Sequence, residues 1–382
     1  MIINPIKLSQ DLISCKSVTP IDDGAIGILR GVLEGLGFSC YALDFTSKED
    51  PAEVRNLYAR IGGGGPNLCF AGHTDVVPPG DLRLWAHDPF DPVIRDEILY
   101  GRGASDMKTA IAAWVAAVSE FLAERESFIG SLSLLITGDE EALAFNGTRK
   151  VLEWLKERNE KIDACIVGEP TSHTRLGDMI KIGRRGSISF TLTVQGAQGH
   201  AAYPQLADNP VTRLINILHD LKEKPLDEGT EFFQKSNLEV TTIDVGNPAA
   251  NVIPALATAK FNIRFNDRHS AKSLEFLVRE MCGKYAGKYD LTVHVTGEAF
   301  ITPPGDLSGL VAGAVKKITG LEPELSTTGG TSDARFIREI CPVVECGLLN
   351  TTAHKIDECA SEADIRSLAA IYKEIIAGFF RG

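Results

Sequence analysis

The segment LLITGDEEALAFNGT, residues 134–148, constrains the fold and chemistry of this chain more than any other. Its apolar run LLI is typical of a buried strand, yet three acids follow almost at once: Asp139, Glu140 and Glu141. Adjacent carboxylates repel one another, and removing them from water costs further free energy. The segment is therefore either a solvated acidic turn or one side of a site that also holds positive charge.

The alternation of extended and helical patterns predicts an α/β fold with a largely parallel sheet. The Ala-rich segment DMKTAIAAWVAAVSEFLAE has apolar residues at helical spacing. We expect helices at 23–36, 106–124 and 146–158, and strands at 54–61, 66–71, 131–137 and 162–167.

A different pattern begins near residue 180. The segments MIKIGRRGSISFTLTVQG and LATAKFNIRFND alternate apolar and polar residues, as half-buried strands do, and 208–223 and 271–286 are helical in pattern. These features predict a smaller α+β domain at 180–294, inserted into a discontinuous catalytic domain of residues 1–179 and 295–382.

The glycine run at 62–65 has two interpretations. It could form a phosphate cradle, but no Lys-Ser/Thr pair or helix start follows it, so a flexible hairpin connection between the two flanking strands is favoured.

Bulk properties exclude several classes of function and location. The net charge of −12 argues against broad binding to nucleic acid or anionic membranes. The N-terminus lacks the pattern of a signal peptide, no apolar stretch approaches the roughly 20 residues of a membrane span, and the eight cysteines include no CxxC pair. We therefore expect a cytoplasmic protein without disulfides.

Potential metal ligands follow three of the predicted strands. His73 and Asp75 follow NLCFAG, Glu140 and Glu141 follow LLITGD, and Glu169 follows ACIVG. Ligand sites of open α/β sheets collect beyond the carboxyl ends of the strands, so these side chains can converge.

Two further candidates come from other parts of the chain. Asp106 stands at the start of the Ala-rich helix, where an ordinary N-cap is the alternative, and His354 follows the apolar run CPVVECGLL. A lone histidine is more often a structural residue. Imidazole and carboxylate together, without thiolate, suit Zn²⁺ or a similar divalent ion.

Charge balance favours two ions over one. If Asp106, Glu140, Glu141 and Glu169 share one pocket, one Zn²⁺ leaves two negative charges, whereas two Zn²⁺ neutralise it. A two-metal site needs a bridging carboxylate. Neighbouring glutamates on an extended segment point in different directions, so one of Glu140 and Glu141 would bind metal and the other would handle a proton.

The ordered motifs GHTDVVPPG, GRGASDMK, TGDEEA, VGEP, GRRGS, GHAAYP, NVIPA, GGTSDARF and AHKIDE resemble the M20 family of co-catalytic metallopeptidases and amidohydrolases, over nearly the whole chain. The resemblance implies that Asp106 bridges two Zn²⁺ ions per subunit, with Co²⁺ as a substitute. It implies His73 and Glu169 as ligands of one ion, and Glu141 and His354 as ligands of the other. Glu140 would be the general base and Asp75 would orient His73. Ala142 departs from the family, in which many members have glycine.

The resemblance also implies the reaction: hydrolysis of the succinyl amide of N-succinyl-LL-2,6-diaminopimelate. Another N-acyl-amino-acid deacylase or a carboxypeptidase is the alternative, and a non-catalytic metal-binding relative is a remote one. Arginine suits the carboxylates of such a small anionic substrate, although the arginines could equally be solvent-facing charge on the inserted domain. The expected substrate-binding residues are Arg184, Arg185, Ser187, Tyr203, Asn251, Arg264, Gly330, Thr331 and Asn350.

His200 lies in the inserted domain, away from every ligand motif. By resemblance it reaches the oxyanion from the partner subunit of a homodimer formed through the inserted domains, and Asn251 also acts across that dimer. A strand-end histidine that caps a turn is the alternative.

Overall fold

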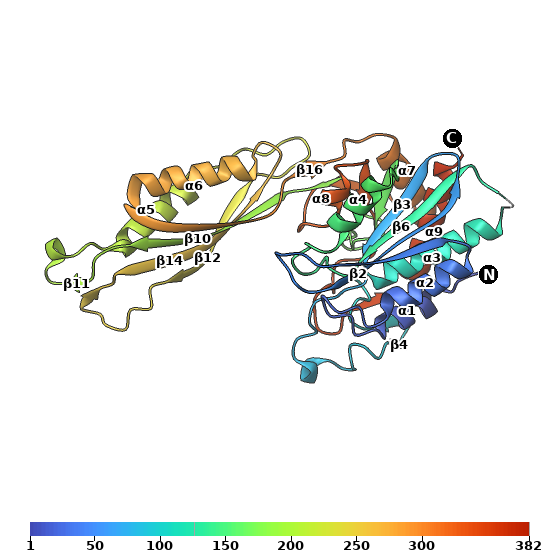
Figure 1. The fold of residues 1–382 in the computed structure, drawn as a ribbon, viewed down its shortest axis with the longest axis horizontal. Coiled ribbons are helices and arrows are strands. Elements are labelled where there is room, and N and C mark those ends of the chain that lie inside the picture. Colours follow the sequence, from blue (N-terminus) through green and yellow to red (C-terminus); the bar gives the residue numbers. More distant parts are fainter. Residues whose placement is uncertain (126, 382) are drawn as a thin grey trace. The chain divides into compact units, whose positions relative to one another are not determined.

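The structure is a computed structural model that describes residues 1–125 and 127–381, and the chain forms two compact units (Figure 1). Unit 1 consists of Met1–Ile182, Thr302–Ser326 and Ser332–Gly382, and unit 2 of Gly183–Ile301 and Thr327–Thr331. The inserted domain predicted at 180–294 differs from unit 2 by a few residues at each end. It also lacks the short second segment of unit 2, which comes from the GGTSDARF motif.

A mixed eight-stranded sheet runs through unit 1 in the order β1-β2-β6-β3-β7-β18-β8-β17. Its centre is parallel, from β6 through β3 and β7 to β18. The expected α/β fold is confirmed. The strands are β1 Ser39–Phe45, β2 Val54–Gly63, β3 Asn67–His73, β6 Gly130–Thr137, β7 Ala164–Val167, β8 Met179–Lys181, β17 Glu324–Ser326 and β18 Val343–Glu345.

The order of these strands corrects one prediction. The glycine run at 62–65 joins β2 to β3, but β6 lies between them, antiparallel to β2 and parallel to β3. The run is therefore not a hairpin of paired neighbours. Local sequence indicates a turn, but it does not reveal a third strand from elsewhere in the chain.

The helices of unit 1 fall into two groups. Helix α3 packs with α1 and α9, and α9 packs with α7; α4 packs on β2, β6 and α8. Helix α3 is buried along nearly its whole length, which explains its alanine-rich sequence. The helices are α1 Pro5–Ile13, α2 Ala25–Gly35, η1 Leu82–Leu84, α3 Lys108–Ala123, α4 Thr148–Glu157, α7 Asp306–Thr319, α8 Ala334–Ile337 and α9 Glu362–Phe379. Within the described residues, no helix has both the length and the apolar character needed to cross a bilayer.

A second sheet of unit 1 has three strands in the order β19-β5-β4. Its strands are β4 Val93–Arg95, β5 Ile98–Tyr100 and β19 Cys359–Ser361. It connects the segment before Asp106 to the segment after His354, which are far apart in the sequence.

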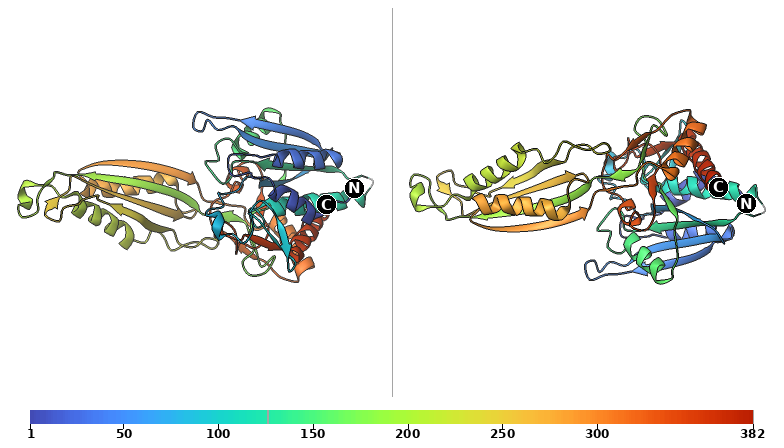
Figure 2. Two further views of the ribbon diagram at one scale, coloured as in Figure 1. Left: turned by 90° about the horizontal axis from the view of Figure 1, so that it is seen from below. Right: turned by 90° about the horizontal axis from the view of Figure 1, so that it is seen from above.

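Unit 2 is built on a four-stranded antiparallel sheet with the order β12-β14-β10-β15, and α5 and α6 cover one face of it (Figures 1 and 2). Burial alternates along β10, as the sequence pattern predicts for a sheet covered on one side. The rings of Phe190 and Phe261 stack in the core with centroids 5.0 Å apart. The elements are β9 Gly183–Arg184, β10 Gly186–Gln195, β11 Gly199–His200, η2 Pro204–Leu206, α5 Pro210–Glu223, β12 Asn237–Asp244, β13 Val252–Ile253, β14 Leu256–Phe265, α6 Ala271–Tyr285, β15 Lys288–Gly297 and β16 Phe300–Ile301.

Phe190→Ala should lower the free energy of unfolding of unit 2 by about 3–5 kcal/mol, because it removes a fully buried ring and leaves a cavity. Urea unfolding followed by hydrogen exchange in α5 and α6 measures the change. Thr191→Ala, on the other face of the same strand, is the control and should change it by less than about 0.5 kcal/mol. Equal effects of the two substitutions would contradict the described core.

Candidate metal and catalytic site

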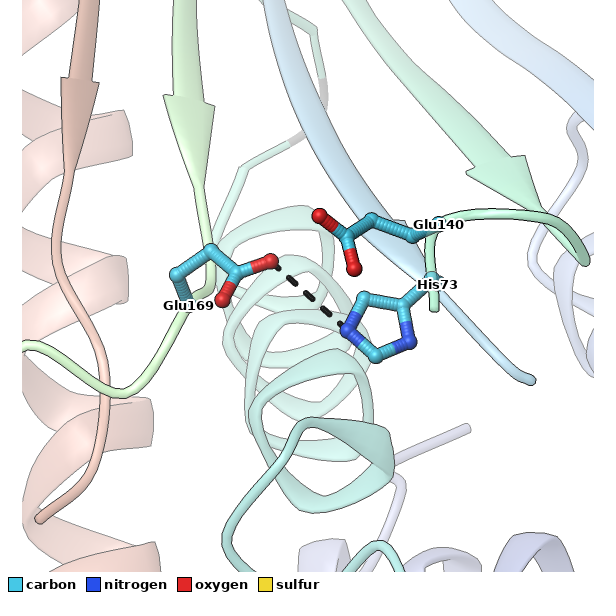
Figure 3. Close-up of side chains that lie close together, drawn as sticks. All are labelled: His73, Glu140 and Glu169. Carbon is cyan, nitrogen blue, oxygen red and sulfur yellow. Dashed lines mark ion pairs between the residues drawn. The ribbon is translucent and has the colours of Figure 1, made fainter. Parts of the chain in front are cut away.

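The carboxyl ends of three parallel strands meet at one edge of the large sheet. His73 is the last residue of β3 and lies opposite Thr137, the last residue of β6. Glu140 follows β6, and Glu169 follows β7, the other neighbour of β3. Figure 3 shows the side chains of His73, Glu140 and Glu169 directed into one shared space.

The imidazole of His73 is fixed in one tautomer. Its Nδ1 lies 2.8 Å from the main-chain oxygen of Asp75, which can only accept a hydrogen bond, so Nδ1 carries the proton. The other nitrogen, Nε2, faces Asp106 Oδ1 at 3.2 Å and Glu169 Oε1 at 3.6 Å, where it donates when the ring is charged and would offer its lone pair to a cation when the ring is neutral. This is the orientation in which a histidine serves as a metal ligand.

Asp106 faces two histidines with its two carboxylate oxygens. Its Oδ1 lies near His73, and its Oδ2 lies 3.3 Å from Nε2 of His354. The same Nε2 lies 2.9 Å from Oε1 of Glu141. The N-cap of α3 is Met107, without a side-chain capping bond, so the interpretation of Asp106 as an ordinary helix cap is wrong.

Main-chain N–H groups make the three consecutive acids tolerable. Both oxygens of the Asp75 carboxylate accept from the amide of Glu140 at 3.2 Å, and one accepts from that of Glu141 at 3.1 Å. Asp139 is fully buried and accepts from the amides of Ala144 and Asn146 at 3.1 and 3.0 Å. The turn is therefore not a solvated one: two buried acids hold it so that Glu140 and Glu141 face the shared space.

The electrostatics of the site reflect this concentration of acids. Burial, together with the charge of Glu169, raises the pKa of Glu140 well above its ordinary value. Burial also raises the pKa of Asp75 to about 6, against the lowering effect of His73. Burial opposes the charged form of Asp106, but the hydrogen bonds with His354 and His73 outweigh it and lower its pKa.

Both imidazoles respond to the same negative potential. The hydrogen bonds with Asp106 and Glu141 raise the pKa of His354 to about 10. Burial lowers the pKa of His73, but Asp106, Asp75 and Glu169 raise it well above its ordinary value. The pocket thus favours positive charge at both histidines.

The donor set fits divalent cations. Two groups of three side chains have ligand atoms within 4.8 Å of one another: His73 with Glu140 and Glu169, and His73 with Asp106 and Glu141. Their donors are imidazole nitrogen and carboxylate oxygen, a combination suited to Zn²⁺. We call the space between His73, Asp106 and Glu169 the first position, and that between Asp106, Glu141 and His354 the second position.

The other expected site residues, apart from Asn350 in unit 1, lie in unit 2 and form two groups. The first group contains Arg184, Arg185, Ser187, Arg264, Gly330 and Thr331. Arg184 Nη1 donates to the main-chain oxygen of Gly330 at 3.2 Å, and Ser187 lies opposite Arg264 on neighbouring strands. Arg184 is buried and Arg185 and Arg264 are half-buried, so the interpretation of these arginines as solvent-facing charge is wrong.

The second group in unit 2 contains His200, Tyr203 and Asn251. Strand β11, which ends at His200, pairs with β13, which begins directly after Asn251. The rings of His200 and Tyr203 lie 5.5 Å apart, and both side chains are exposed. Nδ1 of His200 accepts from the amide of Ala202 at 3.0 Å, so the proton of the neutral ring is on Nε2.

Two further buried acids had no role predicted from the sequence: Asp139 and Glu358, the last residue of the AHKIDE motif. Glu358 is fully buried and accepts hydrogen bonds from the segment that leads to Asp106. Its only signal in the sequence is its place four residues after His354. Ala142 stands where many proteins with these motifs have glycine. Its backbone is not left-handed: the residue of this turn with a positive φ, 54°, is Ala144.

The chain matches known proteins over most of its length. The profile of peptidase family M20/M25/M40 matches residues 69–378. The chain is 57% identical to a succinyl-diaminopimelate desuccinylase of Rhodospirillum centenum, over 99% of this chain and 98% of that protein. It is 56% identical to the protein of that name from Parvibaculum lavamentivorans, over 99% and 96% of the two chains.

Solved structures share the fold. An M20 family metallo-carboxypeptidase from Sulfolobus solfataricus superimposes with a TM-score of 0.78 at 18% identity, over 98% of each chain. The YXEP protein of Bacillus subtilis, described as a dinuclear metal-binding M20 peptidase, gives a TM-score of 0.72 at 15% identity, over 99% of this chain and 98% of that one.

Asp75→Asn should weaken metal binding by about 10–100-fold, because both carboxylate oxygens accept from the N–H of Glu140, and in either orientation of the amide the NH2 group of asparagine would face that N–H instead. Metal content after dialysis against graded chelator measures the change, with circular dichroism as the check on folding. An unchanged affinity would mean that Asp75 does not hold the acidic turn.

Proposed function

This chain belongs to peptidase family M20/M25/M40, and from that premise we propose that it hydrolyses the succinyl amide of N-succinyl-LL-2,6-diaminopimelate. The products are succinate and LL-2,6-diaminopimelate, a precursor in lysine biosynthesis. The observation that carries the two-metal form of this proposal is the Asp106 carboxylate, with one oxygen toward His73 and the other toward His354. A carboxylate in this position can bridge two cations.

His73 and Glu169 would hold an ion at the first position, Glu141 and His354 would hold one at the second, and Asp106 would join them. The nitrogen and oxygen donors favour Zn²⁺, with Co²⁺ as a substitute. When bound, such ions polarise the scissile carbonyl and make an attacking water more acidic. Asp75 holds the His73 tautomer through its main-chain oxygen and the acidic turn through its carboxylate.

Glu140 is the general base of the proposed mechanism. It lies beside His73 and Glu169 in Figure 3 and belongs with them to one group of possible ligands, but the ligand sets proposed for the two positions do not include it. Its carboxylate takes a proton from the attacking water and returns it to the amide nitrogen of the leaving group.

His200 supplies the hydrogen bond to the oxyanion in this proposal. Nδ1 accepts from Ala202, so the ring presents an Nε2–H donor from an exposed position. The connections between the units lie at Ile182, Ile301, Ser326 and Thr331, near the Ser187 end of β10. His200 follows the opposite end of that strand, and Ser187 to Gln195 spans roughly 27 Å. This distance supports the action of His200, and of Asn251 beside it, in the site of a partner subunit.

The arginines of unit 2 would bind the substrate carboxylates. Within the described part of the chain, Arg185 and Arg264 form no ion pair, and burial lowers the pKa of both. A half-buried guanidinium without a carboxylate partner suits an anionic ligand. Ser187, Tyr203, the Gly330 and Thr331 segment, and Asn350 of unit 1 complete the proposed contacts.

Turnover on a panel of N-acyl amino acids distinguishes this activity from those of other M20 enzymes. We expect hydrolysis of succinyl-diaminopimelate in the presence of Zn²⁺ and its loss in EDTA. Faster turnover of acetylornithine or of a peptide would favour the alternatives, and bound zinc without turnover of any acyl amino acid would favour a non-catalytic relative.

Glu140→Gln should retain both metals and lower kcat by at least about 10²–10⁴-fold, because it removes the base without removing a ligand. Elemental analysis and steady-state kinetics on the same preparation measure the two effects. Loss of a metal would show that Glu140 is a ligand and would reverse the roles of Glu140 and Glu141.

His200→Ala should lower kcat by about 10²–10³-fold with metal content and dimer unchanged, because an oxyanion donor acts mainly in the transition state. Mixing it with Glu140→Gln tests whether His200 acts across the dimer. In a mixed dimer with a shared site, both defects fall in one site and the other is intact, so each heterodimer should regain up to about half of the wild-type activity.

The control for this experiment is each inactive protein mixed with itself. Subunit exchange is confirmed by mass. If exchange occurs and no activity returns, His200 serves its own chain, and the proposed metal chemistry is unaffected.

A further inference from the structure

The carboxylate of Glu358 accepts four hydrogen bonds and is fully buried. Oε1 accepts from the amides of Ser105 and Asp106 at 2.8 and 2.9 Å. Oε2 accepts from Nη1 of Arg102 at 2.7 Å and from the amide of Gly103 at 3.0 Å. Both oxygens are therefore engaged by donors of one short segment, and this segment ends at the carboxylate that faces both histidines.

Glu358 is also tied by sequence to the other side of the second position, because it stands four residues after His354. The connection between them is tightly curved, with positive φ of 61° at His354 and 53° at Asp357. Nη1 of Arg102 also donates to the main-chain oxygen of Lys355 at 3.3 Å. The segment 354–358 is thus attached to the segment 102–106 by a side-chain carboxylate and a guanidinium.

The two metal positions differ in what holds their ligands. At the first position, His73 and Glu169 come from the ends of β3 and β7, whose pairing in the large sheet fixes their separation. At the second position, His354 lies in a loop, and so does Asp106, which both positions share. The hydrogen bonds of Glu358 join these two loops directly at the main chain of Asp106.

We infer that Glu358 is a positioning residue that sets the affinity of the second position, with much less effect on the first. This inference rests on the proposed assignment of ligands. Glu358 would not touch the ion. It acts by holding the main chain of Asp106 at a fixed place relative to His354.

Glu358→Gln tests the inference with little change in shape. In either orientation of the amide, its NH2 group faces two donors that the carboxylate satisfied, so two of the four hydrogen bonds that join the loops are lost. Asp227→Asn is the matched control: Asp227 is also a buried carboxylate that accepts from main-chain amides, at Gly229 and Ser236, but it lies in unit 2.

The readout is titration of the metal-depleted proteins with Co²⁺, followed by visible absorption and by competition with a chelator. We expect wild type and Asp227→Asn to bind two equivalents. Glu358→Gln should bind one equivalent with wild-type affinity and the second about 10–100-fold more weakly. Two equivalents with wild-type affinity in folded Glu358→Gln, or equal weakening of both, would overturn the inference.

Two further variants distinguish a failure of this inference from a failure of the proposed two-metal site. Glu358→Asp retains the charge and shortens the side chain, and it serves as the test if the Gln variant does not fold. It should weaken the binding of only the second equivalent of Co²⁺. An unchanged affinity for the second equivalent would overturn the inference. His354→Ala should lose the second equivalent altogether. If wild type itself binds fewer than two equivalents, or His354→Ala loses none, the proposed two-metal site fails instead of the role of Glu358.

Discussion

The structure around the site depends on the placement of acids that repel one another. Three buried carboxylates outside the proposed ligand sets each accept hydrogen bonds from main-chain amides of a segment that carries a site residue. Asp75 and Asp139 hold the turn with Glu140 and Glu141, and Glu358 holds the segment that ends at Asp106. A carboxylate suits this task because its two oxygens accept several N–H groups at once, which offsets much of the cost of its burial.

This arrangement explains why three acids can follow a buried strand. Main-chain amides stabilise the charges of Asp75, Asp139 and Glu358. The acids of the site can therefore remain close together and present negative charge to a cation; they are Asp106, Glu140, Glu141 and Glu169. The raised pKa values of both histidines are a consequence of the same potential. Of the three consecutive acids, Asp139 therefore stabilises the turn, and Glu140 and Glu141 face the site.

Much of this could be predicted from the sequence, because periodicity and strand ends are local signals. The helices expected at 106–124 and 271–286 agree with α3 and α6 to within two residues at each end, and His73 and Glu169 were expected to converge from the ends of parallel strands. The insertion of β6 between β2 and β3 could not be predicted, since strand order is decided by contacts between distant segments. For the same reason, the burial of Arg184 beside Gly330 was missed: alternation indicates which face a side chain is on but not which segment covers it. Glu358 was missed because its partners lie more than 250 residues away.

The separation of chemistry between the units has a consequence for assembly. Unit 1 carries the metal positions and the proposed base, whereas the proposed oxyanion donor stands at one end of a ten-residue strand of unit 2 and the arginines at the other. A rigid antiparallel sheet cannot bring both ends to one place, so a single copy of unit 2 is suited to serve two sites. The proposed two-fold dimer would meet this requirement, because its symmetry would make the exchange reciprocal: each copy would give its His200 and receive one. In such a dimer the sheet of unit 2 would act as a spacer, and its length, set by hydrogen-bonded register along β10, β14 and β15, would determine where His200 can reach.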